Sequence, residues 1–366
     1  MTQAQPTFSV CIPNYNYGHF IGETIQSVLD QTYPLFEVII ADNASTDNSV
    51  EVIRSFNDDR IRLVENRYNI GFAPNLQRAT MYAQNDFINL LSSDDQMKPD
   101  ALETYVEIIR EMSDQAERLV LYSDVDTFDN DGHVTGAVRK APDGFYIHTI
   151  PFSQNGDQPA PIVDAPSYSV YRGLDVLADS LRRLKTFAPF LSTVYSRALW
   201  EAVEGYNSVR TIGPDKFFNY KLLAQDPVVV HVPRTLFRYR AHISPNRASQ
   251  DSNLKQPIDD YLYTIEYKDD YLKTLGLSRR DLIRAFLDRV CLRSGLSHLG
   301  RRNYAQAFRL LMFAFASYPG ETLRLSKTYA LLFLLLLGPL SSRWLAPTLY
   351  GMRARANAAA SDITDV

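Results

Sequence analysis

Four short apolar runs alternate with amphipathic segments over the first 112 residues, and this alternation is the strongest constraint on the fold. Each run is short and bounded by polar residues, which is typical of a buried strand. The segments between them carry apolar residues at helical spacing. Strands that alternate with helices form a mostly parallel α/β sheet with helices on both faces. The predicted strands are 8–12, 37–41, 61–64 and 87–91.

The remainder of the chain continues this pattern and then becomes helical. A turn at 130–132 predicts a hairpin, and 140–169, rich in Pro, Gly and polar residues, predicts a long loop. Further helices are predicted at 101–112, 173–185, 196–203 and 215–224, and further strands at 119–122, 190–195, 228–232 and 235–239. From about residue 260 the pattern is helical.

Acidic residues follow two of the predicted strands directly. Asp42 ends the strand 37–41, and Asp94 and Asp95 follow the strand 87–91. The carboxyl ends of strands in an open α/β sheet are where ligands bind. Two adjacent carboxylates repel each other, and hard oxygen ligands suit Mg²⁺ or Mn²⁺, which commonly bind substrate phosphates. The alternative is a helix start, with Asp100 capping the helix 101–112.

Charge is distributed unevenly along the chain. The net charge of −4 combines −13 in residues 1–270, +11 in residues 271–357 and −2 in residues 358–366, so the acidic front and the basic back suggest different partners. The two cysteines, Cys11 and Cys291, form no zinc or disulfide pattern. The first seven residues lack the features of a signal peptide, which predicts a cytoplasmic protein.

Four motifs occur in a fixed order: Ile-Pro-Asn-Tyr-Asn at 12–16, Ala-Asp-Asn-Ala-Ser-Thr-Asp at 41–47, Asn-Ile-Gly-Phe-Ala at 69–73 and Leu-Ser-Ser-Asp-Asp at 91–95. This series resembles the nucleotide-sugar-binding half of family 2 inverting glycosyltransferases, which have the GT-A fold. The resemblance covers about 8–247. It implies a catalytic domain at 1–247, with a donor half at 1–130 and an acceptor half at 131–247. A basic helical region at 248–366 would follow.

The resemblance also implies roles for the donor-side residues. Pro13, Asn14 and Tyr15 would pack against the base and ribose. Asp42 would accept a hydrogen bond from a uracil or thymine ring, a strong charge-assisted bond. Asp95 would hold a divalent cation, Mn²⁺ or Mg²⁺, on the diphosphate, and Asp94 would face the ribose or the metal. Asn69 and Gly71 complete the donor-binding set.

Two features of this donor half leave alternatives open. Asp42, Ser45 and Asp47 could instead cap the next helix. Many family members carry a further Asp where this chain has Ser92, so this chain offers a metal one fewer carboxylate.

A looser resemblance covers the acceptor half. Family members show Glu-Asp at the start of a helix where this chain has Pro214-Asp215, so Asp215 is the candidate catalytic base. An N-cap role for Asp215 is the alternative. Residues 237–244 resemble the segment that closes over the diphosphate. There His242 would bind the metal or a phosphate, or be a surface group, and Arg238 or Arg240 would stabilise the leaving nucleotide.

The basic C-terminal region lies outside the resemblance. Its uncharged run 328–342 is shorter than the roughly 20 residues that span a bilayer. The run suits a helix in the membrane interface, with basic residues facing anionic lipid. A helix buried on the catalytic domain and a homodimer interface are the alternatives. Nucleic-acid binding is not indicated, because the region lacks a recognisable module.

These observations predict a cytoplasmic, peripheral-membrane glycosyltransferase. It would transfer a sugar from a UDP- or dTDP-sugar to a glycan or lipid-linked acceptor hydroxyl, with inversion. The alternative is a nucleotide-sugar-binding protein of the same fold without turnover. An NAD-dependent oxidoreductase is disfavoured, because Pro-Asn-Tyr-Asn-Tyr-Gly stands where that class has Gly-x-Gly-x-x-Gly.

Overall fold

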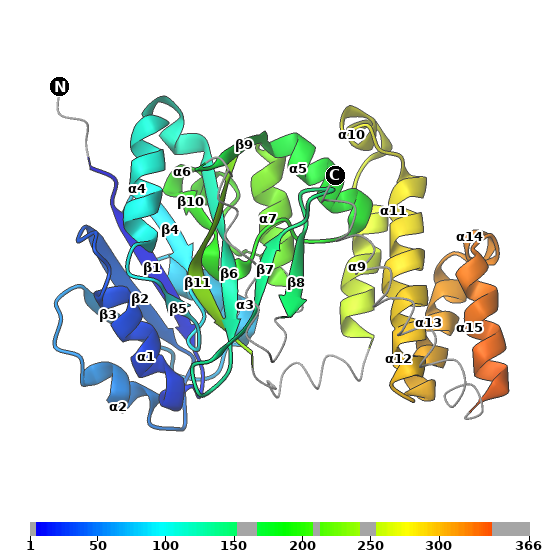
Figure 1. Cartoon of the computed structure of the whole chain (residues 1–366), viewed down its shortest axis with the longest axis horizontal. Coiled ribbons are helices and arrows are strands. Elements are labelled where there is room, and N and C mark those ends of the chain that lie inside the picture. Colours follow the sequence, from blue (N-terminus) through cyan, green and yellow to red (C-terminus); the bar gives the residue numbers. More distant parts are fainter. Residues whose placement is uncertain (1–4, 152–166, 208–212, 242–253, 339–366) are drawn as a thin grey trace, which may run out of the picture. The chain divides into compact units, whose positions relative to one another are not determined.

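The structure is a computed structural model that describes residues 5–151, 167–207, 213–241 and 254–338 (Figure 1). The chain divides into two compact units. The first comprises residues 1–181 and 185–243, and the second comprises residues 182–184 and 244–366. Each unit is described below by itself.

A single twisted sheet organises the first unit, with the order β3-β2-β1-β4-β10-β6-β11-β5. Strands β1 to β4 are parallel, β6 and β11 are parallel to each other, and β10 runs antiparallel between β4 and β6. The strands on this path are β1 (Phe8–Asn14), β2 (Phe36–Asp42), β3 (Ile61–Glu65), β4 (Phe87–Leu90), β5 (Gln96–Met97), β6 (Leu119–Phe128), β10 (Val194–Ser196) and β11 (Val228–Arg240). Off this path lie β7 (Val134–Lys140), β8 (Ile147–Pro151) and β9 (Ser169–Arg172).

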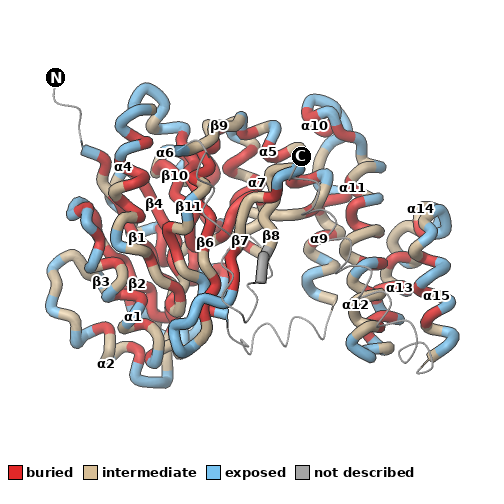
Figure 2. The backbone as a smooth tube through the Cα atoms, in the orientation of Figure 1, coloured by how far each residue is buried: buried red, intermediate tan, exposed pale blue. Residues whose placement is uncertain are grey.

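Helices cover both faces of this sheet, as the sequence predicts. On one face, α1 (Gly18–Leu29), α2 (Ser49–Arg54) and α4 (Ala101–Glu111) share a buried apolar cluster with the strands. On the other, α3 (Phe72–Thr80) contacts β1 and β2, and Phe218 of α7 (Pro214–Ala224) packs on Tyr195 of β10. The unit also contains α5 (Gly173–Arg183), α6 (Arg197–Ala202), and the 3-10 helices η1 (Ser113–Arg118) and η2 (Phe190–Ser192). Figure 2 shows the central strands buried between these layers.

Three predictions for the middle of the chain are wrong in detail. The strand predicted at 190–195 is the 3-10 helix η2 followed by the three-residue strand β10. The strands predicted at 228–232 and 235–239 are one strand, β11, whose register shifts after Val232 because Pro233 cannot donate a ladder hydrogen bond. The segment predicted as a loop, 140–169, contains strand β8 and ends at the first residue of β9. Its residues 152–166 lie outside the described part.

The second unit is helical wherever the structure describes it. Its helices are α9 (Lys255–Glu266), α10 (Asp269–Thr274), α11 (Arg279–Ala285), the π-helix η3 (Phe286–Arg293), α12 (Ser294–Gly300), α13 (Tyr304–Ser317), α14 (Pro319–Leu323) and α15 (Ser326–Leu337). Buried leucines of η3, α12, α13 and α15 form its core. None of the described helices has the length and apolar character needed to cross a bilayer.

Candidate active site

The carboxyl edge of the parallel strands gathers most of the predicted donor-side residues. Asn14 ends β1 and pairs directly with Asp42, which ends β2. The segment that carries Asp94 and Asp95 follows β4, and Arg240 ends β11. Because β1, β2 and β4 are parallel neighbours, their carboxyl ends meet at this edge, where open α/β sheets bind ligands.

Asp42 is buried and fixed by three hydrogen bonds at this edge. Its Oδ1 accepts from Asn14 Nδ2 (2.8 Å) and Ser45 Oγ (2.6 Å), and its Oδ2 accepts from the backbone N–H of Ser45 (2.9 Å). A carboxylate has about four acceptor positions, so one is left for a ligand N–H. Pro13 is half-buried and Tyr15 is exposed beside this group.

None of Asp42, Ser45 and Asp47 is the N-cap residue of α2, although Asp47 bonds to the first residue of that helix. Asp42 and Ser45 bond within the two loops and not to the start of α2, whose N-cap residue is Asn48. Asp47 instead accepts from the backbone N–H of Ser49 (3.0 Å) and from that of Gly18 (2.8 Å). It therefore holds the first residues of α1 and α2 together.

Asn43, which the sequence analysis did not single out, organises the loop that carries Asn69 and Gly71. Its Nδ2 donates to Asn69 Oδ1 (2.9 Å), and its Oδ1 accepts from Asn66 Nδ2 (3.0 Å) and the Ile70 N–H (2.9 Å). Gly71 has φ +91°, a conformation that favours glycine. The signal available in the sequence was the position of Asn43, directly after Asp42 at a strand end.

Asp94 and Asp95 lie in different environments. Asp95 is buried and accepts from the backbone N–H of Arg240 (2.9 Å), whereas Asp94 is half-buried. Burial and the neighbouring Asp94 carboxylate raise the pKa of Asp95 well above its ordinary value. A divalent cation would offset this repulsion and accept both hard oxygen ligands, so the pair fits Mn²⁺ or Mg²⁺.

Arg238 and Arg240, the two arginines of β11 predicted to bind the donor, are engaged with other protein groups. Arg238 donates to Gln96 Oε1 (2.9 Å) and to the Gly132 carbonyl (2.8 Å). Arg240 is buried and donates to the Asp94 carbonyl (3.0 Å) and to Glu23 (2.6 Å). His242, the predicted metal or phosphate ligand, lies outside the described residues.

Asp215, the candidate catalytic base, lies in the first turn of α7. Gly213 occupies the N-cap position, so the strict N-cap alternative for Asp215 does not hold. Asp215 is half-exposed, yet desolvation by the surrounding protein raises the pKa of its carboxyl. Its charge acts on Tyr206, whose ring stacks on Phe218 at 3.9 Å between centroids. A partly exposed carboxyl with a raised pKa is suited to accept a proton.

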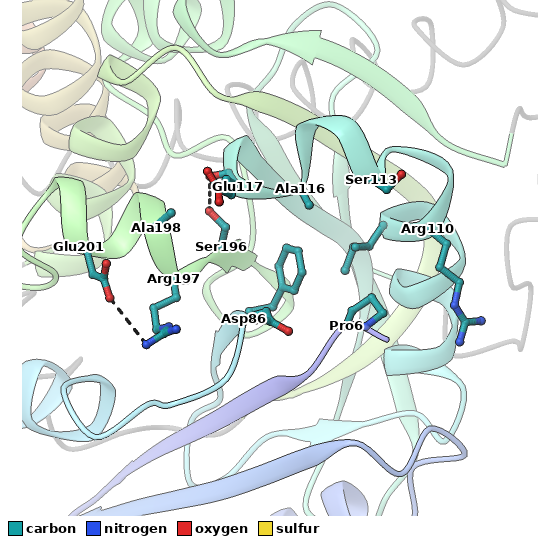
Figure 3. Close-up of a pocket in the computed structure, with 12 residues that line it drawn as sticks. Pro6, Asp86, Arg110, Ser113, Ala116, Glu117, Ser196, Arg197, Ala198 and Glu201 are labelled. Carbon is teal, nitrogen blue, oxygen red and sulfur yellow. Dashed lines mark hydrogen bonds and ion pairs between the residues drawn. The ribbon is translucent and has the colours of Figure 1, made fainter. Parts of the chain in front are cut away.

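Two other features of the first unit resemble ligand sites, but neither contains a predicted site residue. Asp129, Asp131 and His133 place possible ligand atoms within 4.8 Å of one another, but Asp129 Oδ1 accepts from the backbone N–H groups of the other two, as expected for the predicted hairpin turn. A cavity of about 490 Å³ opens at the opposite, amino edge, between the start of β4 and the end of β10 (Figure 3). Asp86, Arg110, Ser196 and Arg197 line it, and none of the predicted site residues does.

Comparisons with known proteins concern mainly the donor half. Residues 9–146 match the model of glycosyl transferase family 2. TuaG of Bacillus subtilis (strain 168) is 38% identical over 115 residues, which cover 31% of this chain and 46% of that protein. The Escherichia coli UDP-Glc:alpha-D-GlcNAc-diphosphoundecaprenol beta-1,3-glucosyltransferase WfgD is 38% identical over 101 residues, which cover 28% of this chain and 40% of that protein. The match thus spans less than half the length of these relatives.

Solved structures extend the likeness to more of the chain. The crystal structure of S. aureus TarS 1-349 matches with a TM-score of 0.53 and 15% identity, over 92% of this chain and 88% of that one. The same protein in complex with UDP-GlcNAc matches with a TM-score of 0.55 and 15% identity, over 85% of this chain and 89% of that one. At this identity the likeness shows the fold. The family match identifies residues 9–146 as a family 2 glycosyltransferase segment, and the structural likeness shows that the fold is of the GT-A type.

Proposed function

We propose that the protein transfers one sugar from a UDP- or dTDP-sugar to an acceptor hydroxyl, with inversion at the anomeric carbon. The observation that carries this proposal is the arrangement at the carboxyl edge. Asn14 and Ser45 fix Asp42 at the end of β2, and the Asp94–Asp95 pair follows β4 at the same edge. Asp42 is suited to bind the base of the nucleotide, and the Asp94–Asp95 pair is suited to the charged diphosphate.

Each residue would have a distinct part in the reaction. Asp42 accepts the imide N–H of a pyrimidine base, and the exposed Tyr15 ring offers a surface on which that base can pack. Asp95 and Asp94 would hold a divalent cation, which would supply positive charge for the diphosphate. Asp215 takes the proton from the acceptor hydroxyl as that oxygen attacks the anomeric carbon and the bond to the diphosphate breaks.

The names of relatives bear on the donor and the acceptor. WfgD acts on a diphosphoundecaprenol-linked sugar, and TarS was crystallised with UDP-GlcNAc. We extend these chemistries to this chain as a lipid-linked or surface-glycan acceptor and a UDP-sugar donor.

A nucleotide-sugar-binding protein without turnover is the second candidate. Ser92 and Pro214 support it, because they replace acidic residues common in the family.

The C-terminal unit supports a proposal about location, namely the cytoplasmic face of a membrane. Helix α15 buries Leu331 and Leu334 in the core of its unit. Its opposite side leaves Tyr329, Phe333 and Leu336 exposed at helical spacing. Residues 289–338 contain seven Lys and Arg and one acidic residue. An apolar helix face in a basic unit fits an anionic lipid surface, with a homodimer as the alternative occupant.

A ligand screen followed by one variant tests the enzyme proposal. Thermal shifts with UDP, dTDP, GDP and their sugars, with and without Mn²⁺, identify the donor, since a ligand at a hundredfold excess over its dissociation constant stabilises the fold by about 2.7 kcal/mol. Release of the nucleoside diphosphate with lipid-linked and glycan acceptors then measures turnover. Asp215→Asn should lower turnover by roughly a hundredfold or more and leave donor binding unchanged.

The matched control is Asp114→Asn, which removes an exposed carboxylate from η1. This variant should retain full turnover. Donor binding by wild-type protein with no turnover on any acceptor would favour the binding-protein alternative. Equal turnover in wild type and Asp215→Asn would remove Asp215 as the base.

A further inference from the structure

Glu23, an exposed residue of α1, accepts hydrogen bonds from Arg240 and Gln96, two neighbours of the Asp94–Asp95 pair. Its Oε2 accepts from Arg240 Nη2 (2.6 Å) and from Gln96 Nε2 (3.0 Å). Gln96 directly follows Asp95 in the chain, and its Oε1 accepts from Arg238 Nη1 (2.9 Å). We call Glu23, Gln96, Arg238 and Arg240 the Glu23 network.

Arg240 connects this network to both members of the acidic pair. Its Nε donates to the Asp94 carbonyl (3.0 Å), and its backbone N–H donates to Asp95 Oδ1 (2.9 Å). The guanidinium is held 4.4 Å from the ring centroids of both Phe20 and Phe128. Its side chain is 2% exposed, so it cannot turn away from the pair. Arg240 therefore acts on the acidic pair from a fixed position.

A buried guanidinium close to Asp95 has consequences for a cation at the same place. The charge of Arg240 acts on the Asp95 carboxylate, as the charge of a bound divalent cation would. Glu23 supplies a carboxylate to Arg240 Nη2, at 2.6 Å. This partner balances the charge of Arg240 without drawing on the acidic pair. Without Glu23, the uncompensated guanidinium would compete with the cation.

We propose that Glu23 is a positioning residue for the cation site, acting through Arg240, and that Arg240 orients the acidic pair. This inference rests on the proposed function, because it concerns the cation that Asp95 and Asp94 would hold. It changes the role predicted for Arg240. Two of its guanidinium nitrogens and its backbone N–H bond to the protein, which supports orientation of the acidic pair more directly than contact with the nucleotide.

The test compares Mn²⁺ binding by wild-type protein and Glu23→Gln in the presence of UDP, with free Mn²⁺ followed by electron paramagnetic resonance. Glutamine keeps an acceptor oxygen but removes the charge. Partners that support metal ligands typically alter metal affinity by 10–100-fold, so the dissociation constant for Mn²⁺ should rise roughly tenfold. Because Glu23 is 57% exposed, the difference should shrink at high salt. The melting temperature without Mn²⁺ should fall only slightly, because Glu23 is largely exposed and glutamine keeps an acceptor for Arg240.

Asp100→Asn is the matched control. It removes an acidic partner from another arginine of β11, Arg234, at the same distance of 2.6 Å but away from the acidic pair. This variant should bind Mn²⁺ as wild type does. Glu23→Asp, which keeps the charge, should lie between wild type and Glu23→Gln.

The outcomes separate this inference from the proposed function. Equal Mn²⁺ affinity in wild type and Glu23→Gln overturns the role of Glu23 while the cation site stands. Weaker binding in Asp100→Asn to the same degree shows a general effect of charge and also overturns it. Wild-type protein that binds UDP but no Mn²⁺ overturns the cation site itself, and the role of Glu23 with it.

Discussion

At the scale of single residues, the protonation of Asp215 offers a test that distinguishes a catalytic from a structural role. Burial raises the pKa of its carboxyl above the ordinary 3.8. A general base works only when deprotonated, so turnover should rise with pH through a pKa above that of an ordinary aspartate. The measurement is kcat/KM as a function of pH, with the donor identified by the screen.

The same raised pKa predicts how Asp215→Asn alters stability. A carboxyl that binds its proton more tightly in the folded state contributes stability below its unfolded pKa, and this contribution is lost as pH rises through the folded pKa. Asparagine has no carboxyl to ionise, so the variant does not lose this stability as the pH rises. Relative to wild type, Asp215→Asn should therefore gain thermal stability as the pH rises above the ordinary aspartate pKa of 3.8. A variant less stable than wild type at pH 8 would indicate that the charge supports the start of α7.

At the scale of elements, Asn43 determines the shape of the loop between β3 and α3. Asn43→Ala removes four hydrogen bonds from a buried position, each worth about 1 kcal/mol, so the free energy of unfolding should fall by about 2–4 kcal/mol. Urea denaturation would show this as a lower midpoint with an unchanged m value. Asn57→Ala, at an exposed position, is the control and should match wild type. An unchanged midpoint for Asn43→Ala would mean that other contacts hold the loop.

Which elements the sequence could predict depends on how far their contacts lie along the chain. Strands β1 to β4 are apolar runs whose periodicity is local, and the ends of β2 and β4 placed Asp42, Asp94 and Asp95 at one edge. Strand β10 has three residues, and its pairing with β4 joins positions about a hundred residues apart. The role of Asn43 is likewise visible only once its loop partners are folded around it. The contact between Glu23 and Arg240 spans 217 positions, beyond the reach of any local pattern.

At the scale of the whole molecule, the second unit carries the prediction about location. Wild-type protein should co-sediment with vesicles rich in phosphatidylglycerol and not with neutral vesicles, and added salt should weaken the binding. Phe333 and Leu336 are 58% and 85% exposed on α15. Replacing both by serine should weaken binding roughly a hundredfold, since each side chain contributes at least about 1.5 kcal/mol when buried in an apolar medium.

The control for this prediction is Ile258→Ser, which removes an exposed apolar side chain from α9 of the same unit and should bind vesicles as wild type does. The size of the protein in solution distinguishes the alternative occupant of α15. If wild type is a dimer that the Phe333→Ser, Leu336→Ser variant dissociates, and neither binds vesicles, the exposed face of α15 joins two copies of the chain. If both remain monomeric and only wild type binds vesicles, the face contacts lipid, and a lipid-linked acceptor becomes the first class of substrate to assay.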